Sequence, residues 1–276
     1  MINENKITLI MSGRYEPETK SNILNIRKIL PKSEIILSTY NEAKKDAKIY
    51  KKYGIKLIIN KDFGDYLEFS NNSLNLIRMM KSFHSGLKIS KNEIILKIRT
   101  DYSLKSKIKE VFFKIQFRRK KIIYKKKKYE LENIYLTDSA HFNLINYHFS
   151  DQVILGRKKQ LLSLYNVKKS KFIKKDKFSR LPSVYGKYGN NLVNEQLIWI
   201  NFLMNIFKEK DAYKIYKSRN LHVQIFNNLK IIDKKYFMVP KRLNNFNIKI
   251  RNYAYNKKNF ISYLLRFYYH VRHKEF

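Results

Sequence analysis

Apolar and polar positions follow a regular order through the first hundred residues. Four short runs are almost entirely apolar, as in strands buried on both faces, and they occupy residues 6–11, 34–40, 56–60 and 93–99. The segments between them have helical periodicity, and they occupy residues 19–30, 41–53 and 71–88. Strands and helices that alternate in this way predict an α/β fold with a mostly parallel, Rossmann-like sheet flanked by helices.

The pattern is less regular beyond residue 100. It predicts helices at 103–117, 157–165 and 191–208, and strands at 134–137, within 147–155 and at 220–226. Two basic runs, 118–128 and 168–180, are interpreted as loops, and the first is alternatively a hairpin. A last predicted helix, 258–271, has an aromatic apolar face opposite a basic face. Such a helix suits either docking on the domain or contact with a membrane interface.

The composition adds a large positive charge to this picture. The 276 residues include 59 Lys and Arg but 22 Asp and Glu, which gives a net charge of +37. Lys, Ile, Asn and Tyr are abundant together, so codon usage in an AT-rich genome accounts for part of this charge. The remaining excess predicts attraction to polyanions, namely nucleic acid, anionic lipid or acidic glycan. The absence of cysteine excludes disulfides, thiolate zinc sites and cysteine catalysis.

No apolar run in the sequence is long enough to span a bilayer, since the longest, 197–207, is interrupted by two asparagines. The first residues lack the basic region and the small-residue cleavage site of a signal peptide. We therefore expect a cytoplasmic protein, attached peripherally to the inner face of the cytoplasmic membrane.

Polar residues follow the first two predicted strands, at the sheet edge where ligands of parallel sheets bind. Ser12, Gly13 and Arg14 come directly after the first strand, and Ser38 and Thr39 end the second. Glycine lets the backbone turn close to a ligand, and arginine can bind a phosphate through two hydrogen bonds. The alternative for both segments is an ordinary strand-end turn with hydroxyl caps.

The fourth predicted strand ends in a cluster of charges. Lys97, Arg99 and Asp101 point to one side of the strand, with Thr100 between the last two. A carboxylate at this position can hold a divalent cation, which would neutralise a nucleotide diphosphate as it leaves. The alternative is a structural ion pair between Asp101 and Arg99, because buried charges need partners.

Three further polar features are candidates for binding or catalysis. Asn75 and Arg78 begin a stripe that continues through Ser82 and Gly86 along the predicted helix 71–88, and this stripe either lines a cleft or faces solvent. Asp151 precedes an apolar strand, and Glu195 begins an apolar helix. Either carboxylate can act as the general base that deprotonates an acceptor hydroxyl. A capping or salt-bridge role is the alternative for each.

Taken together, these motifs resemble the WavE-type lipopolysaccharide-synthesis family of bacterial glycosyltransferases. The resemblance covers about residues 6–205. It rests on the motifs SGR at 12–14, LSTY at 37–40, NxxRxxxSxxxGL at 75–87, LKIRTD at 96–101, SDQVxLG at 150–156 and the Glu-Gln pair at 195–196.

The resemblance implies a GT-A-like fold and transfer of a sugar from a nucleotide-sugar donor to lipopolysaccharide or capsule, through a polysaccharide or lipid-linked acceptor. It implies a nucleotide-sugar and acceptor domain over residues 1–210 and a basic extension over 211–276. Arg99-Thr100-Asp101 stands where GT-A enzymes carry Asp-x-Asp, so Mg²⁺ or Mn²⁺ is expected at Asp101, and the missing first acid weakens that metal dependence. The implied donor-binding residues are Ser12, Gly13, Arg14, Ser38, Thr39, Asn75, Arg78, Lys97, Arg99, Thr100 and Asp101.

The implied base is Asp151 or Glu195, with a slight preference for Asp151. The implied partners are the donor, the acceptor and the anionic inner membrane surface, without a specific nucleic acid. Two other functions remain open at this stage. The basic and aromatic surface is typical of nucleic-acid-binding proteins, although the motifs of their common folds are absent from the sequence. A phosphotransferase acting on a glycan would use the same nucleotide site but break a different bond.

Overall fold

The computed structural model describes residues 2–62, 71–137, 147, 149, 152–166 and 194–238. The first compact unit runs from Met1 to Phe237, and the second covers Met238–Phe276. The predicted domain boundary at residue 210 falls inside the first unit. The second basic run, 168–180, and the predicted helix 258–271 lie outside the described residues.

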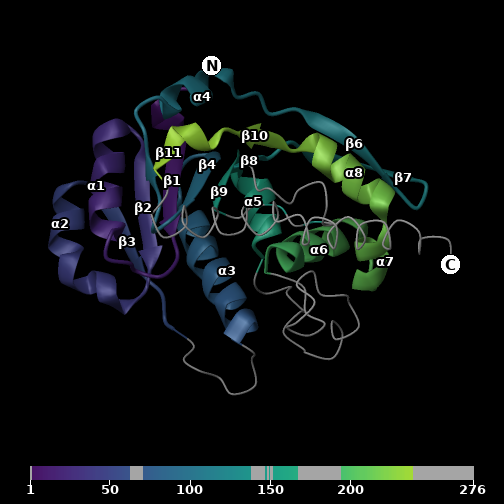
Figure 1. The fold of residues 1–276 in the computed structure, drawn as a ribbon, viewed down its shortest axis with the longest axis horizontal. Coiled ribbons are helices and arrows are strands. Elements are labelled where there is room, and N and C mark those ends of the chain that lie inside the picture. The colour runs from purple at the N-terminus through teal and green to yellow at the C-terminus, as the bar shows by residue number, and fades with distance from the viewer. Residues whose placement is uncertain are drawn as a thin grey trace, which may run out of the picture. The chain divides into compact units, whose positions relative to one another are not determined.

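A seven-stranded sheet forms the centre of the first unit, in the order β10-β8-β9-β4-β1-β2-β3 (Figure 1). The strands β3, β2, β1 and β4 are parallel, β9 is antiparallel to both of its neighbours, and β10 is parallel to β8. This mostly parallel sheet confirms the predicted α/β class. The strands are β1 (Ile7–Ser12), β2 (Glu34–Thr39), β3 (Ile55–Ile59), β4 (Ile94–Arg99), β8 (Tyr135–Thr137), β9 (Val153–Arg157) and β10 (Lys230–Ile232).

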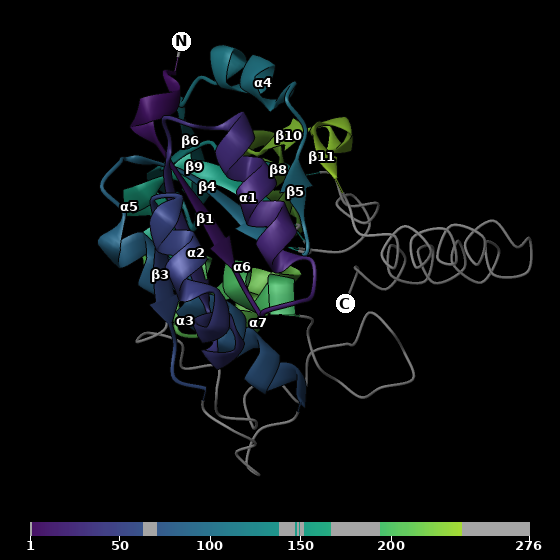
Figure 2. The ribbon, with the colours of Figure 1, turned by 90° about the vertical axis from the view of Figure 1, so that its left-hand side faces the viewer.

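Helices flank the sheet (Figure 1 and Figure 2). Among them α3 contacts β1 and β2, and it also contacts α5 and α6, so these three helices form one packed layer. A side chain at Gly86 of α3 would come within 2.6 Å of Ile10 of β1, so the close approach of this helix to the sheet requires glycine. The helices are α1 (Thr19–Ile29), α2 (Ala47–Lys52), α3 (Asn71–Ile89), α4 (Ile108–Lys114), α5 (Lys158–Leu164), α6 (Asn194–Phe207), α7 (Ala212–Lys217) and α8 (Arg219–Asn228).

The basic run 118–128 forms a hairpin of β6 (Arg119–Tyr124) and β7 (Lys127–Glu132). Its two turn residues, Lys125 and Lys126, have φ angles of 48° and 62°, as the tight turns that match the twist of a hairpin require. The segment predicted as one helix at 103–117 instead begins with the short strand β5 (Ser103–Leu104), which pairs with β11 (Phe237–Met238), and α4 follows.

The predicted strand at 220–226 is wrong, because these residues lie in α8. The backbone N–H of Leu221 donates to the Ser218 hydroxyl, which caps the helix. Leu221 and Ile225 are buried, four residues apart, whereas Val223 between them is 40% exposed. This spacing is that of one helical face.

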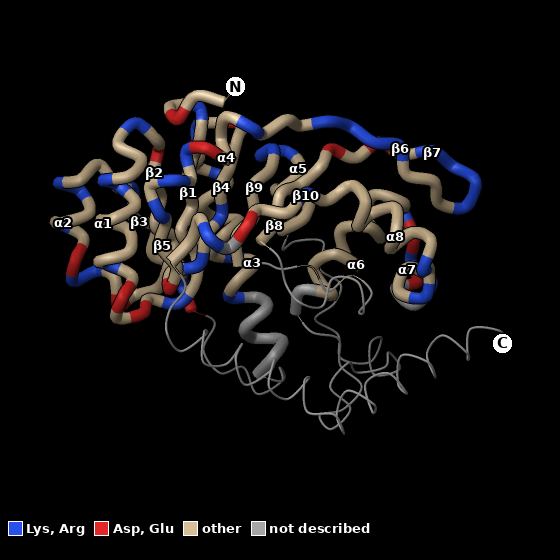
Figure 3. The backbone as a smooth tube through the Cα atoms, turned by 45° about the horizontal axis from the view of Figure 1, so that its top comes forward, with Lys and Arg blue, Asp and Glu red and all other residues tan. Residues whose placement is uncertain are grey.

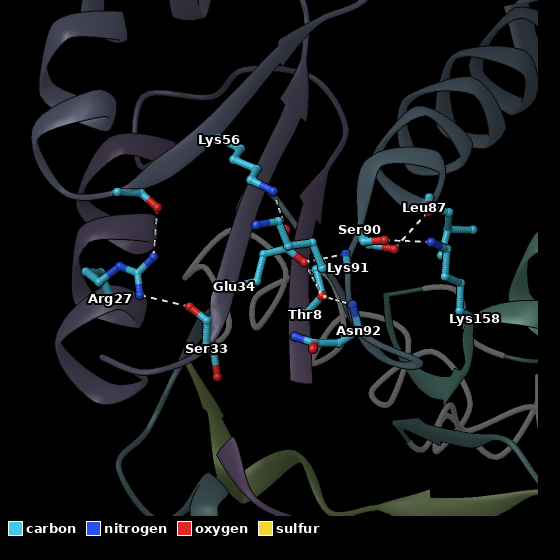
Figure 4. Close-up of polar contacts among 11 residues, drawn as sticks. Thr8, Arg27, Ser33, Glu34, Lys56, Leu87, Ser90, Lys91, Asn92 and Lys158 are labelled. Atoms are coloured by element: carbon cyan, nitrogen blue, oxygen red, sulfur yellow. Dashed lines mark hydrogen bonds and ion pairs between the residues drawn. The ribbon is translucent and has the colours of Figure 1, made fainter. Parts of the chain in front are cut away.

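The amino ends of the strands are joined by a polar cluster around Glu34 (Figure 4). Its carboxylate accepts hydrogen bonds from the Thr8 hydroxyl at 2.5 Å and the Lys91 N–H at 2.7 Å, and it pairs with Lys56. Burial raises the pKa of Glu34, but the contacts with Lys56 and Thr8 outweigh it and the pKa lies below its usual range. The cluster ties β1, β2 and β3 together at the edge opposite the polar loops.

Candidate functional site

The loop after β1 is clamped between the carboxyl ends of two other strands. The N–H of Gly13 donates to the Ser38 carbonyl at 3.4 Å, and the Thr39 hydroxyl donates to the Gly13 carbonyl at 2.8 Å. On the β4 side, the Thr100 hydroxyl donates to the Arg14 carbonyl at 2.5 Å. The backbone around Arg14 is thereby fixed, whereas its side chain is exposed.

Gly13 is the residue that allows this turn. Its φ of +135° lies in the region that residues with side chains rarely adopt. A side chain there would also approach the Thr100 hydroxyl to 3.3 Å. The structure therefore supports the prediction that glycine brings this backbone into a tight turn at the sheet edge.

A second hydrogen-bond network holds Tyr15, the next residue of the loop after β1. The sequence did not indicate this network. The Tyr15 hydroxyl donates to the Asp46 carboxylate at 2.6 Å, and it lies 2.6 Å from the Tyr50 hydroxyl. The Lys20 ammonium pairs with the same carboxylate at 2.8 Å. Burial, and then the bond to Asp46, raise the pKa of Tyr15 far above its usual range. Tyr15 is therefore a neutral hydrogen-bond donor that anchors the loop to α2.

Three residues stand in one row at the carboxyl edge, on the face that α3 covers. Ser12 of β1 is in register with Ser38 of β2 and with Arg99 of β4. The Ser38 hydroxyl donates to the Ser82 carbonyl of α3 at 2.5 Å and accepts from the Asn60 amide at 3.0 Å. Ser38 thus joins β2 to α3, and its hydroxyl proton is already donated within the protein.

Ser12, in the middle of this row, has a different environment. It is 3% exposed, and its hydroxyl has no hydrogen-bond partner among the described residues. A buried hydroxyl without a partner costs on the order of 1–3 kcal/mol. A ligand bound at this edge can supply the missing partner. Ser12 is therefore a candidate binding residue at this edge.

Arg99 and Asp101 form a two-pronged ion pair. The Arg99 Nε atom lies 3.0 Å from Asp101 Oδ1, and the terminal nitrogen NH2 lies 2.7 Å from Oδ2. The Asp101 side chain is 1% exposed and the Arg99 side chain is 37% exposed. The structural pairing that the sequence left open is thus present, and it turns the cation outward and the anion inward.

The described residues do not fit the expected site for Mg²⁺ or Mn²⁺ at Asp101. Both carboxylate oxygens already accept hydrogen bonds from Arg99, and a guanidinium repels a second cation at the same carboxylate. Hard divalent cations need several oxygen ligands. Within the described ranges, no group of three or more His, Asp or Glu side chains could hold a metal ion.

Lys97 and Arg78, two further predicted donor-binding residues, lie in different environments. Lys97 is fully buried in the core, with its ammonium 5.8 Å and 5.7 Å from the ring centroids of Phe83 and Tyr165. Arg78 of α3 pairs with Asp62 at 2.8 Å, and both side chains are partly exposed. Lys97 is thus part of the packing between β4 and the helix layer, whereas Arg78 lies within reach of solvent.

The side chains of three other predicted site residues are not among those that the structure describes. Asp151 lies outside the described residues, while Asn75 and Glu195 lie in α3 and α6 with side chains that are not described. The polar stripe of α3 was predicted to line a cleft or face solvent. Ser82 and Gly86 of this stripe are instead buried against β2 and β1.

Comparison with known proteins assigns a family to this arrangement. The family model described as WavE lipopolysaccharide synthesis matches residues 14–260, which is most of the chain. A search of curated proteins found no match.

Several solved structures are similar at low sequence identity. The apo-form glycosyltransferase GlyE of Streptococcus pneumoniae TIGR4 is 15% identical over 82% of this chain and 54% of its own, with a TM-score of 0.40. The inositol-1-phosphate CTP transferase of T. maritima is 12% identical over 84% and 87%, with a TM-score of 0.41. The galactosyltransferase LgtC is 11% identical over 83% and 74%, with a TM-score of 0.39. The chain spans about half the length of the GlyE chains.

Proposed function

Since the chain belongs to the WavE lipopolysaccharide synthesis family, we propose that it is a glycosyltransferase. It transfers a sugar from a nucleotide-sugar donor to a polysaccharide or lipid-linked acceptor of lipopolysaccharide or capsule synthesis. The donor lies across the carboxyl ends of β1, β2 and β4, where ligands of parallel sheets bind.

The observation that supports this site best is the unsatisfied hydroxyl of Ser12. It is buried, and it stands in register beside Arg99, whose guanidinium is partly exposed. A hydroxyl donor beside a guanidinium suits the oxygens of a phosphate. Gly13, Arg14 and Thr100 complete the proposed donor site through the clamped loop.

The proposed reaction forms one bond and breaks one. The acceptor hydroxyl oxygen becomes bonded to the anomeric carbon of the sugar, and the bond from that carbon to the phosphate oxygen breaks. The electron pair leaves with the nucleotide, and the proton of the acceptor hydroxyl passes to a carboxylate. We assign this base role to Asp151 or Glu195, with Asp151 preferred because it stands next to β9 in the acceptor half of the sequence.

Ligand-induced thermal stabilisation tests the donor site, because a ligand that binds the folded state raises its stability. The full chain is melted with UDP, CMP, GDP and dTDP at moderate salt, which screens loose binding to basic loops. We expect one nucleotide to stabilise the wild type and Ser12→Ala to lose most of that shift. Ser106→Ala, which removes an exposed hydroxyl away from the edge, is the matched control. Equal responses to all four nucleotides in both variants would contradict the proposal.

Attachment to the anionic inner membrane surface is the second part of the proposal. The β6–β7 hairpin carries a dense run of Lys and Arg residues (Figure 3). They are exposed, and Ile123 among them is 53% exposed. Each basic residue near an anionic membrane contributes on the order of 1 kcal/mol. No helix within the described ranges is long and apolar enough to cross a membrane. The basic residues are Arg118, Arg119, Lys120, Lys121, Lys125, Lys126, Lys127 and Lys128.

Sedimentation with phospholipid vesicles tests this attachment. We expect salt-sensitive pelleting with vesicles that contain anionic lipid and none with purely zwitterionic vesicles. Replacing Lys126, Lys127 and Lys128 by Gln should reduce pelleting. The control replaces the exposed Lys44, Lys48 and Lys52 by Gln, which removes the same charge elsewhere. Equal pelleting of the two triple variants would contradict a role for the hairpin.

The mass of the reaction product distinguishes a glycosyltransferase from the alternative, a phosphotransferase that acts on a glycan. A phosphotransferase would leave phosphate in the product, whereas a glycosyltransferase would not. Tight, salt-sensitive binding of RNA or DNA without any response to nucleotides would instead favour the nucleic-acid-binding alternative.

A further inference from the structure

The ion pair between Arg99 and Asp101 at the end of β4 exposes its positive partner and buries its negative partner. The Asp101 carboxylate is 1% exposed, whereas the Arg99 side chain is 37% exposed. A buried carboxylate is costly unless it is paired and hydrogen-bonded, and Arg99 supplies both contacts at 3.0 Å and 2.7 Å. The geometry of the pair is therefore that of a buried anion that fixes the orientation of an outward-facing cation.

Further contacts hold Arg99 in this orientation. Its backbone N–H donates to the Gln152 carbonyl at 3.2 Å, and its guanidinium carbon lies 5.9 Å from the centroid of the Tyr102 ring. The Tyr102 hydroxyl donates to the Gln152 side chain at 2.7 Å. A guanidinium fixed by a carboxylate and an aromatic ring loses little further freedom when it binds a ligand.

The orientation of the Arg99 guanidinium matters because Ser12 stands beside it on the neighbouring strand. Arg99 is in register with Ser12 on the same face of the sheet, and the Ser12 hydroxyl lacks a partner among the described residues. A phosphate at this position would accept a hydrogen bond from the hydroxyl and face the guanidinium. Arginine stays charged at every physiological pH, so this positive charge does not depend on a bound ion.

We infer that Arg99, positioned by Asp101, replaces the divalent cation of the donor site and neutralises the donor phosphate. This inference rests on the proposed glycosyltransferase function. As the bond from the anomeric carbon to the phosphate oxygen breaks, the electron pair and its negative charge collect on that oxygen. Arg99 stabilises this charge. Asp101 is a positioning residue, which acts through Arg99 and not as a metal ligand.

Calorimetric titration of the full chain with UDP, GDP and CMP, in EDTA and in Mn²⁺, tests the inference. The matching nucleosides, which lack phosphate, serve as second probes. We expect the preferred nucleotide to bind the wild type in EDTA within about threefold of its affinity in Mn²⁺. Arg99→Gln should lose at least about tenfold in nucleotide affinity, which is about 1.4 kcal/mol, and leave nucleoside affinity unchanged.

Asp101→Asn separates a positioning role from a metal-ligand role. If Asp101 positions Arg99, this variant weakens nucleotide binding even in EDTA, by about threefold to tenfold, with nucleoside affinity unchanged. If Asp101 binds a metal, the variant matches the wild type in EDTA and loses its response to Mn²⁺. Arg99→Lys keeps a charge but not the two-pronged contact, so it tests the same point if either other variant fails to fold. Lys28→Gln, at an exposed side chain of α1 outside both the candidate site and the hairpin, is the control.

The outcomes also separate this inference from the proposed function. Nucleotide binding that requires Mn²⁺ and is lost in Asp101→Asn would overturn the inference and leave the glycosyltransferase proposal standing. Absence of nucleotide binding to the wild type under both conditions would overturn both.

Discussion

The hydroxyl of Thr100 donates a 2.5 Å hydrogen bond to the backbone carbonyl of Arg14 and so joins the end of β4 to the loop after β1. These two residues are 86 positions apart in the sequence. The bond fixes the carbonyl of a residue whose side chain is exposed at the candidate donor site. Thr100 thus shapes the site through the backbone of the loop after β1.

Replacing Thr100 by Val tests this relationship, because it keeps the shape of the side chain and removes the hydroxyl. The Arg14 carbonyl then loses its partner, and we expect unfolding free energy to fall by about 1–2 kcal/mol. Nucleotide affinity should fall several-fold because the loop is less fixed. Chemical denaturation and calorimetric titration measure the two effects. Thr100→Ser, which keeps the hydroxyl, should behave like the wild type, and equal losses in both variants would refute the explanation.

Gly13→Ala tests the geometry of the same loop. The φ of +135° strains any residue with a side chain, and the new methyl would meet the Thr100 hydroxyl. We expect a loss of stability of about 1–3 kcal/mol together with loss of nucleotide-induced stabilisation. Gly54→Ala is the matched control: its φ is +63°, and nothing lies within 4 Å of the added methyl. That variant should lose about 1 kcal/mol and keep its response to nucleotide. If both variants kept the response, the loop would not form part of the donor site.

The strands β1, β2 and β4 were predictable because they are buried on both faces and therefore appear as continuous apolar runs. The edge strand β3 is only partly buried after Ile55, but its residues are still mostly apolar. In contrast, the apolar residues Leu221, Val223 and Ile225 are spaced two apart, as in a strand. In the structure they lie in a helix, which Ser218 caps and in which Val223 is exposed. Alternation of apolar and polar residues over a few positions cannot distinguish a strand from a helix when tertiary contacts decide which residues are buried.

The candidate site was predictable in its location but not in its internal contacts. Parallel strands place their following loops at one edge, so Ser12, Arg14 and Arg99 were expected to lie near one another. The sequence left open whether Asp101 pairs with Arg99 or holds a metal, because both depend on side-chain geometry. It gave no sign of the bond between Tyr15 and Asp46, which joins residues 31 positions apart.

Tyr15→Phe tests the anchor that the sequence did not indicate. The variant keeps the ring but removes the hydroxyl that donates to Asp46 and lies 2.6 Å from the Tyr50 hydroxyl. Asp46 keeps its contact with Lys20, so we expect a stability loss of about 1–2 kcal/mol and weaker nucleotide binding. Amide hydrogen exchange should become faster in residues 13–16. Tyr53→Phe, at an exposed tyrosine, is the control, and unchanged exchange in Tyr15→Phe would show that the anchor does not order the loop.

Glu209, just after α6, should make the stability of the hairpin depend on pH. The hydrogen bond from Lys125 is the largest cause that lowers the pKa of Glu209 to about 2, and Tyr124 donates to the same carboxylate at 3.0 Å. A lowered carboxylate pKa contributes stability above the unfolded-state pKa, about 4.3 for Glu, and this contribution is lost as the pH falls toward 2. Wild type should therefore exceed Glu209→Gln in unfolding free energy by a constant amount above pH 5. The difference should shrink as the pH falls from 4.5 to 3 in chemical denaturation. A difference that stayed the same over this interval would show that the charge of Glu209 contributes nothing to holding the hairpin on the helical layer.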